Sequence, residues 1–145
     1  IIGAEPFVNG VAALLGAMTD DKTNEILPEY KNIRIYPDDV RDFLRTGNMK
    51  FKQIWILHPD PWPKAKHEKR RLLQRELLEL LASHLTYDGE IIIGTDHWGY
   101  YDWIIDQVSH TNLNATVPDI ATIQTRYQNK NMAATDAPKY LVVTR

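Results

Sequence analysis

The chain of 145 residues contains no cysteine, which excludes disulfide bonds and thiolate metal sites. It also lacks an apolar run long enough for a membrane-spanning helix, and we predict no membrane association. Positive charge is not in excess, because the formal net charge is −2. A nucleic-acid partner must therefore be met by a local basic cluster, since the chain as a whole offers no positive field. The absence of cysteine fits a reducing compartment, and we expect a cytoplasmic protein.

What the chain does contain is the composition of a globular domain. Hydrophobic residues make up 43% and charged residues 25% of the sequence, which is typical of one soluble domain with an apolar core. We therefore predict a single domain over residues 1–145. The opening residues, "IIGAE", have the pattern of a strand inside a sheet. We expect about one further strand and a Gly-rich turn to precede Ile1 in the native protein.

Strand and helix patterns alternate along the chain. Apolar runs predict strands over residues 1–5, 33–39, 52–57, 90–96 and 139–145. Apolar residues at helical spacing predict helices over residues 7–18, 40–47, 67–85 and 98–110, and "YDG" predicts a turn at 87–89. This alternation predicts an α/β fold with a mostly parallel sheet and helices on both faces.

Carboxylates follow four of the predicted strands. Glu5 ends the first, Asp38 and Asp39 follow the second, Asp60 follows the third and Asp96 ends the fourth. Ligands of open α/β sheets bind outside the carboxyl ends of the strands, and an acid in such a position often binds ribose hydroxyls. The alternative is that these residues form turns and cap the next helix, as Asp commonly does.

Asp60 has an unusual setting, because it lies between Pro59 and Pro61 and precedes Trp62. The two prolines restrict the backbone on both sides and hold the carboxylate on an extended segment. That setting favours a preorganised polar contact, and Trp62 offers a flat face for stacking on a base. An ordinary loop with a core-packing tryptophan is an equal alternative.

Five basic residues follow within eight positions. They are Lys64, Lys66, Lys69, Arg70 and Arg71, with His67 and Glu68 among them. Cations are disfavoured at a helix N-terminus, whereas a bound phosphate would be attracted both by them and by free backbone N–H groups. The residues therefore indicate either an anion site or a solvated face. The five histidines show no metal-ligand spacing, and we predict no metal site.

The segment "HPDPWPKAKHEKRR" resembles the signature of the tRNA (guanine-N7-)-methyltransferases, in which a Pro-Asp-Pro-Trp segment precedes basic residues. The likeness extends over nearly the whole chain, in the family's order. It includes "IGAEPFVNGVAALL", "NIRIYPDDVRDFL", "GEIIIGTDHWGYYDWI" and "TRYQNK". The Pro-Asp-Pro-Trp segment with its basic residues is specific to the family, whereas the other blocks are individually weak.

The resemblance implies a Rossmann-like class I methyltransferase that uses S-adenosylmethionine and acts on tRNA. We expect the protein to be a monomer or a homodimer. It assigns Glu5 to the cofactor ribose, Asp39 to the region near adenine, and Asp60 to both the cofactor and the catalytic centre. The implied substrate contacts are Lys64, Asp96, Thr125, Arg126, Tyr127 and Gln128. The implied RNA-binding residues are Lys66, His67, Glu68, Lys69, Arg70 and Arg71.

Three features depart from the family pattern. His58 stands where the family usually has an aromatic residue, Gln128 replaces the usual Glu, and residues 1–145 lack the family's Gly-rich loop. The last two favour a rival hypothesis, a methyltransferase-like module that binds RNA without turnover. A nicotinamide-dependent enzyme is a second rival, because Glu5 would serve an NAD ribose equally well. That rival leaves the basic residues without a role.

Overall fold

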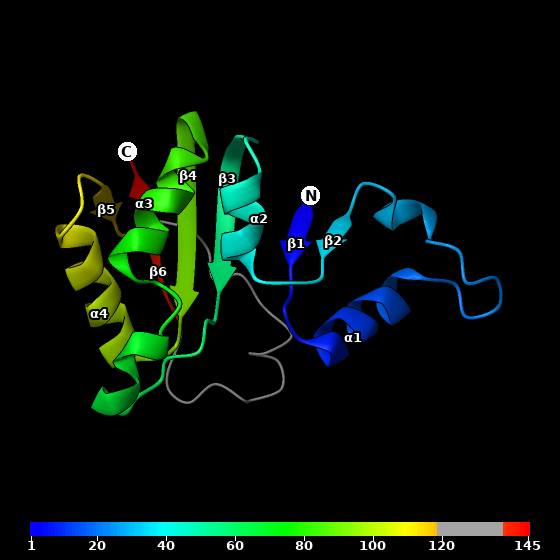
Figure 1. Cartoon of the computed structure of the whole chain (residues 1–145), viewed down its shortest axis with the longest axis horizontal. Helices are drawn as coiled ribbons and strands as arrows, with labels where there is room; N and C mark the ends of the chain where they lie inside the picture. Colours follow the sequence, from blue (N-terminus) through cyan, green and yellow to red (C-terminus); the bar gives the residue numbers. More distant parts are fainter. Residues whose placement is uncertain (119–137) are drawn as a thin grey trace. The chain divides into compact units, whose positions relative to one another are not determined.

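A computed structural model describes residues 1–118 and 138–145 of the chain. Residues 1–48 and 49–145 form two compact units (Figure 1). The single domain over residues 1–145 stays a prediction. Within the described residues, no helix combines the length and apolar character that crossing a membrane requires.

The first unit contains a pair of parallel strands followed by helices. Its elements are β1 (Ile2–Ala4), α1 (Val8–Met18), the 3-10 helix η1 (Pro28–Tyr30), β2 (Arg34–Tyr36) and α2 (Val40–Thr46). The predicted strands and helices are confirmed with slightly shorter bounds, whereas η1 lies in a stretch predicted as a connection. Ala4 pairs with Tyr36 at the carboxyl ends of the two strands. Glu5 and the Asp38–Asp39 pair therefore follow at the same edge.

The second unit contains a four-stranded sheet in the order β3-β4-β6-β5 (Figure 1). The strands are β3 (Phe51–Leu57), β4 (Leu85–Thr95), β5 (Asn114–Thr116) and β6 (Lys139–Thr144). β3 and β4 are parallel, as are β1 and β2, but β6 runs antiparallel to both β4 and β5. The α/β class is confirmed, with a mixed sheet in this unit. β5 was not predicted, because a strand of three residues is too short for its alternating pattern to stand out.

Two helices pack against β4 and against each other in the second unit, α3 (Arg75–Ser83) and α4 (Trp98–Ser109) (Figure 1). The predicted leucine stripe of α3 is buried at Leu77, Leu78 and Leu81. Other fully buried core residues are Leu73, Leu85, Ile91, Ile93, Tyr100, Ile104 and Val143. Full burial of one such aliphatic side chain contributes about 1.5 to 3 kcal/mol. This core fixes the strand ends from which the candidate site extends.

The prediction of one helix over residues 67–85 is wrong at its start. Residues Ala65–Arg70 form a 3-10 helix, η2, and the α-helix begins only at Arg75. Between them α4 holds the backbone of Leu73. The Leu73 N–H donates to the Tyr100 hydroxyl (3.2 Å), and the Leu73 carbonyl accepts from the Trp103 indole (3.3 Å). Because these side chains occupy both polar groups, the α-helical bonding pattern is interrupted here.

The turn predicted at residues 87–89 lies inside β4 as an irregularity. Phe51 pairs with Leu85 and Gln53 with Glu90, so the intervening residues of β4 bulge from the ladder. A Cβ on Gly89 would lie 2.8 Å from the Phe51 carbonyl oxygen, which explains why glycine is needed. The strand therefore starts before the turn-forming residues instead of after them.

Candidate active site

The carboxyl ends of β3 and β4 place His58 beside Asp96. These two residues follow adjacent parallel strands, and the His58 Nδ1 lies 3.9 Å from the Asp96 Oδ1. Their side chains are only 9% and 10% exposed. The histidine that departs from the family pattern is thus next to a predicted substrate contact. The imidazole and the carboxylate, both largely buried, therefore form a polar pair at this edge of the sheet.

The proline loop, residues 58–63, carries Asp60 away from the end of β3. Asp60 is exposed. His58 and Trp62 have φ angles of 51° and 42°, in the left-handed region that non-glycine residues rarely adopt. Such conformations cost on the order of 1 to 3 kcal/mol and persist where surrounding contacts hold them. The loop is therefore fixed by its surroundings, which is what a preorganised carboxylate requires.

Those surroundings centre on Arg71, which is buried at 6% exposure. Its Nε donates to the Pro61 carbonyl (2.9 Å), and its Nη2 donates to the Trp62 carbonyl (3.4 Å). The guanidinium also lies over the Trp103 ring at 4.7 Å and over the Tyr100 ring at 5.6 Å. Sequence reasoning missed this, because arginine in a basic run is usually exposed.

The rest of the basic segment, residues 64–71, is more open. Lys64, Lys66, Lys69 and Arg70 are exposed, whereas His67 and Glu68 are half-buried. Trp62 is covered from this side, because the Arg70 guanidinium lies over its ring at 5.0 Å and His67 meets it edge-on at 5.6 Å. Arg70 thus lies over the indole that we expected to offer a flat face for base stacking, whereas the exposed Lys64, Lys66 and Lys69 are open to a polyanion.

The start of α4 adds an aromatic and cationic group to the same edge. His97 is the N-cap, and its Nδ1 accepts a hydrogen bond from the Tyr100 N–H (3.1 Å). The Lys139 ammonium lies 3.7 Å from the Trp98 ring centre and 4.9 Å from that of Tyr101. Lys139 reaches this edge because β6 pairs antiparallel with β4, opposite Thr95. Local sequence gives no signal for such a contact between distant residues.

In the first unit, the Glu5 carboxylate turns toward the start of α1. Its Oε1 accepts a hydrogen bond from the Phe7 N–H (2.9 Å), and the Glu5 N–H donates to the Tyr36 carbonyl (3.0 Å). The side chain passes over Gly10, where a Cβ would lie 2.6 Å from the Glu5 Cδ. Glycine at this position therefore makes room for the carboxylate.

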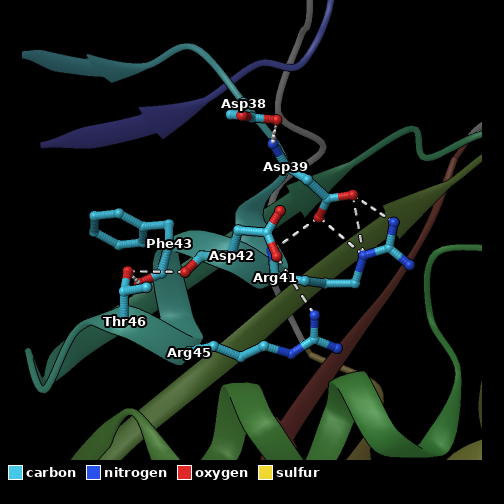
Figure 2. A network of polar contacts seen from close by, with 7 residues as sticks. All are labelled: Asp38, Asp39, Arg41, Asp42, Phe43, Arg45 and Thr46. Carbon is cyan, nitrogen blue, oxygen red and sulfur yellow. Dashed lines mark hydrogen bonds and ion pairs between the residues drawn. The ribbon is translucent and has the colours of Figure 1, made fainter.

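Asp39 is held in the polar network shown in Figure 2. It caps α2 by accepting from the Arg41 N–H (2.8 Å), and both its carboxylate oxygens accept from the Arg41 guanidinium. This hydrogen bonding with Arg41 lowers the pKa of Asp39. The neighbouring Asp38 Oδ1 accepts from the Asp39 N–H (2.7 Å). The capping role weighed for strand-end acids is thus present, while a cofactor role for Asp39 stays a prediction.

The remaining predicted contacts, Thr125, Arg126, Tyr127 and Gln128, lie outside the described residues. Among residues 1–118 and 138–145, no group of three or more histidines and acids is arranged to hold a metal ion.

Comparison with known proteins identifies the family. The family whose model is described as "Putative methyltransferase" matches residues 1–141. The chain belongs to this methyltransferase family. A tRNA (guanine-N(7)-)-methyltransferase of Wolbachia pipientis wMel is 39% identical over 112 residues, covering 77% of this chain and 48% of that protein. A protein of the same name from Caulobacter vibrioides (strain NA1000 / CB15N) is 33% identical over 156 residues, covering 100% of this chain and 65% of that protein.

The fold is shared with solved methyltransferases. A solved structure described as "SMU.776, a putative methyltransferase complexed with SAH" matches with a TM-score of 0.60 at 14% identity, covering 99% of this chain and 38% of that one. The resemblance to the tRNA (guanine-N7-)-methyltransferases and the predicted methyltransferase fold are therefore confirmed. The chain spans about half the length of the curated relatives that it matches.

Proposed function

We propose that the protein carrying this chain transfers a methyl group from S-adenosylmethionine to N7 of a guanine in tRNA. One observation carries the proposal: an exposed carboxylate, Asp60, stands on a fixed proline loop that leads directly into an exposed basic segment. The names of the relatives described above support the same substrate. We also propose a cytoplasmic location, where tRNA is available.

The first unit supplies groups that fit the cofactor. S-adenosylmethionine brings a methyl group activated on a sulfonium, together with a ribose and an amino acid part. Glu5 and the Asp38–Asp39 pair follow adjacent parallel strands at one edge, the position from which carboxylates accept hydrogen bonds from ribose hydroxyls. A solved neighbour of the same fold contains SAH. Glu5 would hold the ribose and Asp39 would lie near the adenine.

The reaction requires the alignment of the cofactor and the guanine more than it requires proton transfer. Guanine N7 carries an in-plane lone pair and no proton, so no general base is needed. The chain's main task is to hold two reactants in line, which is the entropic part of catalysis. The N7 lone pair would form a bond to the methyl carbon as the bond from that carbon to the sulfonium sulfur breaks, with S-adenosylhomocysteine leaving as a neutral thioether. The positive charge would thereby pass to the purine, where the Asp60 carboxylate would stabilise it. Lys64 and Asp96 would hold the guanine, with Thr125–Gln128 as further predicted contacts.

The basic segment would bind the tRNA backbone beside this centre. Lys66, Lys69 and Arg70 are exposed and follow the proline loop directly. Phosphate contacts of this kind position a nucleic acid without reading its sequence. The carboxylate and the cations that follow it in the sequence therefore have complementary roles. The carboxylate would stabilise the positive charge of the reaction, and the cations would bind the negatively charged tRNA backbone.

The test is methyl transfer by the full-length gene product. We expect incubation with methyl-labelled S-adenosylmethionine and unmodified tRNA to yield labelled 7-methylguanine in a nuclease digest. Label on another atom, or no label, would refute the proposed reaction. Binding of tRNA without any transfer would instead favour the rival hypothesis of a non-catalytic RNA-binding module.

A substitution at Gly10 tests the place of Glu5 in the cofactor site. We expect Gly10→Ala to weaken S-adenosylmethionine binding about 10-fold, since hydrogen bonds to a charged group contribute about 1.5 to 3 kcal/mol. The new methyl would overlap the Glu5 side chain and displace its carboxylate. Isothermal titration calorimetry on the full-length gene product measures the change.

Gly16→Ala is the matched control in the same helix. A Cβ there has no heavy atom within 4 Å, apart from the groups of its own helix and chain neighbours. Both substitutions exchange glycine for a better helix former, worth up to about 1 kcal/mol. If both variants bind the cofactor as tightly as the wild type, Glu5 does not hold it.

A further inference from the structure

Resting on the proposed function, we propose that Arg71 is a positioning residue that fixes the proline loop, and with it Asp60, instead of contacting RNA. Burial is the first argument. The Arg71 side chain is 6% exposed, whereas Lys69 and Arg70 just before it are exposed. A phosphate contact needs an accessible cationic group. Lys69 and Arg70 offer such a group, whereas the buried Arg71 does not.

The second argument is where its donors point. Arg71 Nε donates to the Pro61 carbonyl at 2.9 Å, and Nη2 donates to the Trp62 carbonyl at 3.4 Å. These carbonyls belong to the two residues that follow Asp60. Because its prolines lack an N–H, the loop contains few backbone donors of its own. Its carbonyl oxygens therefore depend on donors from outside the loop. The fork of one guanidinium supplies them.

The third argument is the rigidity of the support. Arg71 lies over Trp103 and Tyr100, and both of these side chains also bind the Leu73 backbone. Glu68 Oε1 lies 3.5 Å from the Arg71 Nη1 and balances part of its charge. The aromatic side chains of α4 therefore fix the guanidinium on one side, and its hydrogen bonds on the other side hold the proline loop. Trp62, at φ 42°, is held in a conformation that it would otherwise leave.

A guanidinium is specific to this task. Its planar fork donates in several directions at once, whereas a lysine ammonium is a compact charge on a flexible stem. Arg71→Lys keeps the positive charge and most of the apolar stem but loses the fork. A role in RNA binding predicts that lysine is an adequate substitute, because it also contacts phosphate. A role in positioning predicts that it is not.

The experiment compares Arg71→Lys, Arg71→Ala and Lys69→Ala in the full-length gene product. We expect both Arg71 variants to lower the single-turnover methylation rate at saturating tRNA by about 10- to 100-fold, the scale of a small misplacement of reacting groups. Their salt dependence of tRNA binding should match the wild type. Lys69→Ala should instead reduce that log-log slope by about 0.7 to 0.9. Methylguanidinium added to Arg71→Ala should restore part of the rate.

A wild-type rate in Arg71→Lys, or a reduced salt slope in Arg71→Ala, would overturn the proposal. A second measurement does not depend on activity. The amide resonances of Asp60 and Trp62 should shift in Arg71→Lys and stay in place in Lys69→Ala. If the wild type transfers no methyl group, the proposed function fails, and these resonances still decide whether Arg71 fixes the loop. Arg71→Lys also keeps the test valid if Arg71→Ala does not fold.

Discussion

Replacing Asp60 with asparagine is expected to lower the single-turnover rate of methyl transfer by about 100-fold or more, the scale of losing one preorganised electrostatic contact. Asparagine keeps the size and much of the hydrogen bonding of aspartate but removes its charge. The negative charge of Asp60 also acts on Tyr100, a buried residue of α4. Burial is the main cause of the raised pKa of Tyr100, and the negative charge of Asp60 adds to it. Transfer of labelled methyl to unmodified tRNA by the full-length gene product measures the effect.

Stability and a second aspartate provide the controls. Asp60 is exposed, so Asp60→Asn should change the free energy of unfolding by less than about 0.5 kcal/mol, as surface substitutions usually do. Asp102→Asn removes the same charge from an exposed position on α4 and should leave the rate unchanged. Near-normal turnover in a folded Asp60→Asn variant would leave Asp60 as a turn residue and refute the catalytic assignment.

The second large effect is expected from the exposed cations of the basic segment. Replacing Lys66, Lys69 and Arg70 together by alanine should weaken tRNA binding about 100-fold at 0.1 M salt and reduce the log-log salt slope by roughly 2 to 2.7. The reason is that each lost phosphate contact no longer releases a counterion. Cofactor affinity should stay the same. Binding isotherms at several salt concentrations give both quantities.

A matched triple variant separates the segment from the net charge. Lys22, Lys31 and Arg45 are exposed cations of the first unit, and their replacement by alanine changes the charge equally. We expect a much smaller change in slope from that triple. Equal slopes in the two variants would mean that tRNA affinity comes from the overall charge and that the basic segment is no more than a solvated surface.

Much of the fold was predictable because local pattern decides it. The run "KQIWIL" became β3, and the leucines at four-residue spacing became the buried face of α3. The predicted start of this helix was wrong, and its local sequence does not reveal the reason. Tyr100 and Trp103 take the backbone groups of Leu73 from the next helix. Likewise, β6 pairs antiparallel with β4, and its own residues do not specify that direction.

The candidate site divides in the same way. Asp60 was recognisable because two prolines enclose it, and this is a local feature. Arg71 was grouped with its basic neighbours because charge alone does not indicate burial. The contact of Lys139 with Trp98 depends on the sheet topology. Sequence thus identifies which groups are chemically special, whereas tertiary packing decides which of them are free to meet a ligand.

The bonds between α4 and Leu73 also imply an order of events during protein synthesis. Tyr100 and Trp103 follow Leu73 by 27 and 30 residues. At common translation rates of about 5 to 20 residues per second, the ribosome adds Trp103 roughly 2 to 6 s after Leu73. In that interval the backbone groups of Leu73 lack the two side chains that bind them in the folded protein. The support that α4 gives to this segment, and through Arg71 to the proline loop, therefore forms only after Trp103 has been added.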